Sequence, residues 1–176
     1  MPRPTCCAFV GASLDGCIAQ GDGGLDFLEP FASEDHGYEA FLAAVDSILV
    51  GRRTWEAARG LAPWPYRGKR VVVLAHGAER GVHGEAFARG DVAAVLDRMG
   101  EEGARRVYAD GGAVVSQLVL AGCVDELTVS IVPRLLGDGI RLFQPPLPRR
   151  RLELVLAHAF PSGTVQLSYR VRGDGP

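Results

Sequence analysis

Two short segments of the sequence combine glycine with residues that can bind an anion. The first is Gly51-Arg52-Arg53-Thr54, which follows the apolar run 47–50 and precedes a helix-compatible stretch at 55–59. A strand that ends at glycine and turns directly into a helix leaves free backbone N–H groups, which favour an anion together with the helix dipole. Thr54 can cap this helix, and the two arginines add bidentate donors. The segment indicates a phosphate site, with an ordinary junction carrying solvated arginines as the alternative.

The second segment is Asp110-Gly111-Gly112-Ala113, between a short strand expected at 106–109 and a helix expected at 114–120. The missing side chains at Gly111 and Gly112 would let a ligand approach the backbone closely, although glycines also serve tight turns. The new helix again directs its N-terminus at this place. Two such junctions in one domain favour the phosphate interpretation, because ligands of open α/β sheets collect at the carboxyl ends of strands.

The elements that must position these segments alternate between strands and helices. Apolar strands are expected at 6–11, 47–50, 70–75, 85–88 and 106–109, and helices at 33–45, 91–99 and 114–120. Asp91 is expected to cap the second helix, and Ser33 or Glu34 the first. The last third differs, with a long strand at 125–132, a bend at 133–139, and partly alternating segments at 152–156 and 165–171 that predict a hairpin.

This pattern predicts an α/β fold of three layers. We expect a mixed, mostly parallel sheet of about eight strands, with helices on both faces and a C-terminal antiparallel hairpin. We also expect a single domain over residues 1–176.

The composition limits the classes of function. The chain has 176 residues, of which 47% are hydrophobic and 23% are charged, as in a globular protein. A net charge of −2 gives no sign of a nucleic-acid or membrane surface, and no apolar run approaches the length of a membrane span. The N-terminus lacks the apolar stretch of a signal peptide, so a cytoplasmic location is expected. The cysteines match no zinc or redox spacing, so we expect buried free thiols and no metal at Cys6, Cys7, Cys17 and Cys123.

In their order along the chain, these motifs resemble a known superfamily. Gly51-Arg52-Arg53-Thr54-Trp55-Glu56 resembles the cofactor-phosphate motif of dihydrofolate reductase. Segment 12–19 resembles the Ser-Leu-Asp-Gly opening of the reductase domain of bifunctional riboflavin-biosynthesis proteins, and segments 111–113, 122–127 and 133–143 resemble the same branch. The resemblance covers nearly the whole chain. Because no deaminase segment precedes it, the chain is most similar to stand-alone proteins that resemble this C-terminal reductase domain.

The resemblance implies a dihydrofolate reductase-like fold, an NADPH-dependent reductase and a homodimer, with the late strands as the candidate interface. The implied substrate is a pterin, pyrimidine or similar heterocycle, as in dihydrofolate reductase or 5-amino-6-(5-phosphoribosylamino)uracil reductase. His76 stands where the family often has a small hydroxyl residue and a basic one, so the preference for NADPH rests on the paired arginines. The implied cofactor-binding residues are Ile18, Ala19, Val50, Gly51, Arg52, Arg53, Thr54, Leu74, His76, Gly111, Gly112, Ala113 and Val114.

The catalytic carboxylate follows from the same resemblance. Besides the hydride, the substrate nitrogen needs a proton. In dihydrofolate reductase a helix carboxylate binds the pterin, and the resemblance places that role on Asp35, with Glu34 and Asp26 as alternatives if the loop length differs. The riboflavin branch does not rely on this carboxylate, and an acid is also expected here for the helix dipole alone. A non-catalytic nucleotide-binding domain that retained the fold is the second function class, because fold does not fix function.

Overall fold

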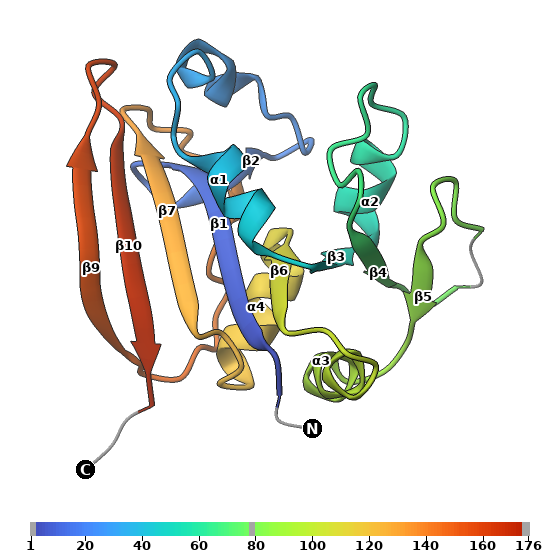
Figure 1. Cartoon of the computed structure of the whole chain (residues 1–176). Helices are drawn as coiled ribbons and strands as arrows, with labels where there is room; N and C mark the ends of the chain where they lie inside the picture. Colours follow the sequence, from blue (N-terminus) through green and yellow to red (C-terminus); the bar gives the residue numbers. More distant parts are fainter. Residues whose placement is uncertain (1–2, 78–79, 174–176) are drawn as a thin grey trace.

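One eight-stranded sheet forms the middle of the fold in the computed structural model, which describes residues 3–77 and 80–173 (Figure 1). The strand order is β5-β4-β3-β6-β1-β7-β10-β9. The first six strands in this order run parallel, whereas β10 is antiparallel to β7 and β9 is antiparallel to β10. The strands are β1 (Thr5–Ser13), β3 (Ser47–Gly51), β4 (Arg70–Leu74), β5 (Ala86–Ala88), β6 (Arg106–Asp110), β7 (Glu126–Val132), β9 (Arg151–Ala159) and β10 (Val165–Arg172). The predicted mixed sheet with a C-terminal hairpin is confirmed.

Helices cover both faces of the sheet, as the continuous apolar strands predict (Figure 1). Helices α3 (Val92–Glu101) and α4 (Gly112–Leu120) pack on one face, where their apolar side chains join Ala8 and Val10 of β1. Helices α1 (Tyr38–Ala44) and α2 (Arg52–Ala58) pack on the other face, where Phe9 of β1 points. Alternate residues of β1 therefore serve two separate cores.

A small second sheet was not predicted from the sequence. It pairs β2 (Cys17–Gln20) with β8 (Gly139–Arg141), and a 3-10 helix, η1 (Asp26–Phe31), follows β2. The carboxylate of Asp15, in the turn before β2, accepts hydrogen bonds from the Ser13 hydroxyl at 2.6 Å and from the backbone of Leu136 at 3.1 Å and Gly137 at 2.8 Å. Asp15 thus joins two distant turns, which agrees with a turn-shaping role.

Two helix starts differ from the sequence-based expectation. Helix α1 begins only at Tyr38, because Gly37 adopts a φ of 78° and so lies outside the helix, which rules out Ser33 or Glu34 as its cap. Helix α2 begins at Arg52 directly after Gly51, and no side chain caps it. The predicted cap at Thr54 is wrong, because this residue lies inside the first turn. The Asp91 cap is confirmed by a 3.0 Å hydrogen bond from the Ala94 N–H.

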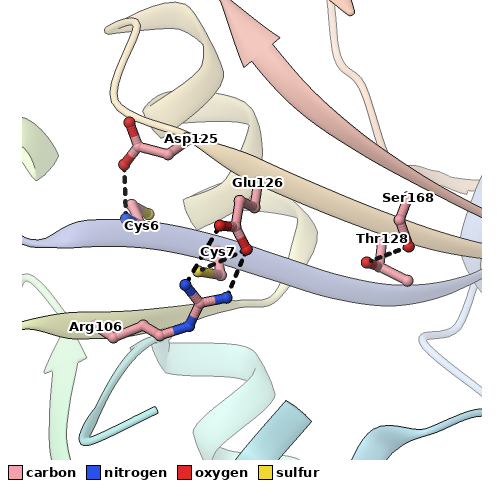
Figure 2. Close-up of polar contacts among 7 residues, drawn as sticks. All are labelled: Cys6, Cys7, Arg106, Asp125, Glu126, Thr128 and Ser168. Carbon is pink, nitrogen blue, oxygen red and sulfur yellow. Dashed lines mark hydrogen bonds and ion pairs between the residues drawn. The ribbon is translucent and has the colours of Figure 1, made fainter. Parts of the chain in front are cut away.

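Polar contacts tie together the N-terminal ends of the central strands (Figure 2). Arg106 of β6 donates two hydrogen bonds to Glu126 of β7, at 2.5 and 3.3 Å, beside the Cys7 thiol of β1. Asp125 accepts the backbone N–H of Cys6 at 2.8 Å and pairs with Arg3 at 3.1 Å. Each of the two acids, Asp125 and Glu126, is thus paired with an arginine, and the four cysteines are buried and free, as predicted. Burial raises the pKa of Cys7 to about 12, so this thiol stays protonated.

Candidate cofactor and substrate site

A cavity of about 1020 Å³ lies at the carboxyl ends of the parallel strands, where ligands of open α/β sheets collect. Segments from both halves of the chain line it, including the two glycine junctions, the segment after β2, the end of β7 and the turn before β10. Of the cofactor residues predicted from the sequence, those that line the cavity are Ile18, Ala19, Arg53, Thr54, Gly111, Gly112 and Ala113.

The other predicted cofactor residues lie outside the described lining. Val50 and Val114 are fully buried, and the backbone of Gly51 packs against Val114, since a Cβ there would lie 3.3 Å from Val114 Cγ2. Arg52 pairs with Glu56 across one turn of α2 at 2.9 Å on the exposed side. Residues 74 and 76, the predicted Leu74 and His76, lie at and after the end of β4. None of these predicted cofactor residues therefore belongs to the described lining of the cavity.

The two glycines of the second junction bring three elements together. Gly111 has a φ of +90°, and a Cβ on it would lie 2.3 Å from Thr54 Oγ1. A Cβ on Gly112 would lie 2.4 Å from Ile18 Cδ1. The side chains of Thr54 and Ile18 therefore occupy the space beside these glycines that the sequence analysis assigned to a ligand. The result is that α2, α4 and β2 meet at the start of α4, with the Thr54 hydroxyl beside it.

The structure places Asp35 away from this cavity. Its side chain is exposed and accepts the Gly37 N–H at 2.8 Å, whereas the neighbouring His36 and Tyr38 line the cavity. Glu34 accepts the Ser162 backbone N–H at 3.0 Å and also bonds the Ser162 hydroxyl, and Asp26 is exposed at the start of η1. None of the three carboxylates belongs to the described lining, so the geometry does not support the catalytic role predicted for Asp35.

The carboxylate that does line the cavity is Asp110, which the sequence analysis did not single out. It is half-buried at the end of β6 and accepts a hydrogen bond from the hydroxyl of Tyr66, which lies in the loop before β4. Burial raises the pKa of Asp110, although hydrogen bonds from Tyr66, Tyr108 and the Gly111 backbone oppose this effect. Because its pKa is raised, this carboxyl holds a proton to higher pH than an ordinary aspartate does. An acid directly before Gly111-Gly112 at the end of an apolar strand was the available signal.

The rest of the cavity wall is largely apolar and aromatic. Phe9, Tyr38 and Tyr108 come from the α1 side of the sheet, and the Phe9 and Tyr38 rings lie 5.5 Å apart in an edge arrangement. Leu28 and Phe31 of η1 add an aliphatic and an aromatic side chain. Such a wall suits a flat ring, since aromatic groups supply apolar area and preferred edge or stacked contacts.

Neutral polar groups from β7 and the hairpin complete this wall. Ser130 and Thr164 line the cavity, and Gln166 donates to the Ser130 hydroxyl at 3.0 Å and to the His36 carbonyl at 2.9 Å. The Gln166 amide therefore links the segment before α1 to β7 and fixes this side of the cavity.

The glycine-rich segment 20–25 borders the cavity through Gly21, Asp22, Gly23 and Leu25. It is a tight turn in which Asp22 accepts the Gly24 N–H at 2.8 Å. Among residues 3–77 and 80–173, no group of three or more His, Cys, Asp or Glu side chains is placed to hold a metal ion. Over the same ranges, no helix has the length and apolar character needed to cross a membrane.

Comparison with known proteins agrees with this geometry. The family described as the RibD C-terminal domain matches residues 4–166. This chain belongs to that family. It is 32% identical over 166 residues to the uncharacterized protein YwjB of Bacillus subtilis (strain 168), covering 92% of this chain and 94% of YwjB.

Two solved structures have folds similar to that of this chain. A protein from Shewanella sp. PV-4 assigned to riboflavin biosynthesis superposes with a TM-score of 0.87 at 25% identity, covering 96% of this chain and 99% of that one. Dihydrofolate reductase from Enterococcus faecalis, complexed with NADP(H), superposes with a TM-score of 0.64 at 14% identity, covering 97% and 98%. The predicted dihydrofolate reductase-like fold is confirmed, and membership of the RibD C-terminal domain family supports a reductase-like function.

Proposed function

We propose that this protein is an NADPH-dependent reductase that transfers a hydride to a pterin, pyrimidine or similar heterocycle. The observation that carries the proposal is the position of Asp110. This carboxyl, with its raised pKa, lines the same cavity as the start of α4 and directly precedes Gly111. A proton donor therefore lies beside a place suited to an anion, as the reduction of a C=N bond with a dinucleotide requires.

The residues at the start of α4 fit the phosphates of a nicotinamide dinucleotide. The first turn of this helix, Gly112–Ala113, lines the cavity and presents backbone N–H groups to it. Arg53 adds an exposed guanidinium and Thr54 a hydroxyl at the same end. Ile18 and Ala19 would lie against the nicotinamide. The choice of NADPH rests on the arginines of α2 and on the NADP(H) held by the Enterococcus faecalis structure.

When bound, the reduced nicotinamide supplies the hydride, and the protein supplies position and a proton. The aromatic wall holds the ring of the substrate and keeps water out. Asp110 gives its proton to the substrate nitrogen while the adjacent ring carbon gains the hydride, so that one C=N bond becomes a C–N single bond. Tyr66 holds the carboxyl in place through its hydroxyl.

We further propose that the protein is a homodimer joined through the hairpin. All nine residues of the edge strand β9 are exposed, and they include Leu152, Leu154, Val155 and Leu156 at 43 to 55% exposure. An unpaired edge strand with apolar side chains is a surface that proteins normally cover. A second copy can cover it with the same strand, as two-fold symmetry allows.

The test follows binding and turnover separately. NADPH and NADH are titrated while the fluorescence of Trp55 and Trp64 is recorded, and oxidation of the cofactor is then followed with dihydrofolate and with candidate pyrimidines. The proposal expects saturable NADPH binding and turnover of at least one heterocycle that is lost in Asp110→Asn. Binding without turnover of any heterocycle favours the non-catalytic nucleotide-binding alternative. Failure of both cofactors to bind contradicts both functions.

A further inference from the structure

The charged side chains along the cavity are unevenly divided between the two signs. Among the lining residues that the structure describes, the acids are Asp22, Glu56 and Asp110, whereas Arg53 is the one arginine or lysine. His36 is the one histidine of this set. Glu56 is paired with Arg52 at 2.9 Å, and Asp110 accepts a hydrogen bond from Tyr66 and has a raised pKa, so what limits a second anion is that Arg53 is the one arginine or lysine of the described lining.

The arginine lies at the cofactor end. Arg53 directly precedes Thr54, and the Thr54 side chain touches the backbone of Gly111 at the start of α4. The first residues of this helix, Gly112 and Ala113, line the cavity, and the first N–H groups of a helix have no intrahelical partner. The groups that favour an anion are thus gathered in one place, and the dinucleotide phosphates of the proposed function occupy them.

The opposite wall of the cavity has no arginine or lysine in the described lining that could bind a second phosphate. It is built from η1, β1, β7 and the turn before β10, and its side chains include Leu28, Phe31, Val132, Ser130 and Thr164. Arg141 of the neighbouring β8 donates to the Asp15 carbonyl at 3.4 Å and is not part of the described lining. A phosphate monoester in such a wall would lose hydration without gaining an arginine or lysine as a partner.

We propose that the substrate of this site is an uncharged, planar heterocycle without a phosphate group. The inference rests on the proposed function, because it assigns Arg53 and the start of α4 to the cofactor. It separates this chain from a reductase that requires 5-amino-6-(5-phosphoribosylamino)uracil, whose phosphoryl group needs a cation of its own. The apolar wall binds the ring, and Asp110 meets a nitrogen at its edge.

A matched pair of ligands tests this inference. The unphosphorylated 5-amino-6-ribosylaminouracil, its 5-phosphate, and 7,8-dihydropterin are titrated calorimetrically into the full chain, with saturating NADP⁺ and again without it. We expect at least one uncharged ligand to bind about tenfold or more tightly than the phosphate. Equal or tighter binding of the phosphate, or no binding of either uncharged ligand, would overturn the inference. Failure of the proposed function is seen separately, as the absence of NADP⁺ binding in the same instrument.

A variant with an added positive charge in the cavity tests the inference without relying on the shape of one ligand. Leu25 lines the cavity and is 54% exposed, so Leu25→Lys adds a cation at little cost to folding. The matched control is Leu14→Lys, at a position that is 65% exposed and outside the described lining. We expect Leu25→Lys to reduce the preference for the uncharged member of the pair about fivefold and Leu14→Lys to leave it unchanged. An unchanged ratio in Leu25→Lys contradicts the inference.

Discussion

The hydroxyl of Tyr66 donates a hydrogen bond to the carboxyl of Asp110, and the two residues lie 44 positions apart in the sequence. Tyr66 is only 3% exposed, whereas Asp110 reaches the cavity. The phenol therefore holds the carboxyl from the protein side and leaves the other side to a ligand. Loss of this hydrogen bond should therefore raise the pKa of Asp110.

Replacing Tyr66 by Phe should move the alkaline limb of the kcat profile to higher pH. The proposed donor works only when Asp110 is protonated, so kcat falls as the pH rises through the pKa of this carboxyl. The Tyr66 hydrogen bond lowers that pKa, against the larger effect of burial, and its loss raises the pKa further. Tyr108 and the Gly111 N–H also act on this carboxyl and remain in the variant. A limb that stays fixed while the melting temperature falls would show a purely structural role.

Replacing Asp110 by Asn should lower kcat about a hundredfold or more while NADPH affinity changes by less than about twofold, because a general acid acts on the reaction and not on cofactor binding. Asp35→Asn is the matched control and should keep kcat within about twofold, since its carboxylate bonds Gly37 on the exposed side. Steady-state kinetics decide between them. Loss of kcat in Asp35→Asn alone would restore the sequence-based prediction.

Replacing Gly111 by Ala should weaken NADPH binding about tenfold or more, because the new methyl group would collide with Thr54 Oγ1 and shift the start of α4. Gly103→Ala is the control, since Gly103 has a similar φ of +98° but no atom within 4 Å of the added Cβ. Both variants carry the backbone strain, so both should lose stability. Only Gly111→Ala should lose affinity in a fluorescence titration, and equal affinities would contradict the assigned site.

Replacing Asp15 by Asn should make the free energy of unfolding decrease less as the pH is lowered. Hydrogen bonds from Ser13, Leu136 and Gly137 lower the pKa of Asp15 from 3.8 to about 2. Because the folded state prefers the carboxylate, this stabilisation is present above the unfolded pKa and is lost as the pH falls through about 2. Urea unfolding of both proteins from pH 5 to pH 2, about the span of this titration, measures the difference. Parallel curves would show that the carboxylate contributes nothing.

Replacing Leu154 by Asp should convert the proposed dimer to a monomer, because the charge would be buried beside the partner's apolar strand. The dissociation constant should rise about a hundredfold or more, as measured by sedimentation equilibrium. Leu14→Asp, at an exposed position on another part of the surface, should leave it unchanged. A wild-type protein that sediments as a monomer would refute the proposed interface directly.

Periodicity and apolar runs were sufficient to predict the sheet and its two helical layers. Strands that are buried on both faces, such as β3 and β4, are continuous apolar segments that can be recognised locally. The start of α1 was misplaced for an equally local reason. Ser33 and Glu34 satisfy the rules for helix caps, but the Asp35 side chain bonds Gly37, whose left-handed conformation keeps the preceding residues out of the helix. The cap signal at residues 33–34 and the turn formed by Asp35 and Gly37 favour different helix starts, and the sequence alone does not show which one the folded chain adopts.

The site was predicted in part because its glycine junctions are continuous segments of sequence. Which residues of a junction reach the cavity depends on side-chain direction, so Thr54 lines it while Val50 is buried in the core. The role proposed for Asp110 involves Tyr66, which approaches it only in the folded chain. Such a long-range contact leaves no pattern in the surrounding residues.

The place of β1 between β6 and β7 has a consequence for biosynthesis. This strand is synthesised well before its register partners, which begin at Arg106 and Glu126, about a hundred residues later. Until then an apolar strand has both edges open, and the nascent protein is exposed to wrong pairing with other chains. A chain stalled before residue 126 should therefore bind chaperones, whereas one in which β7 has emerged can pair both edges of β1.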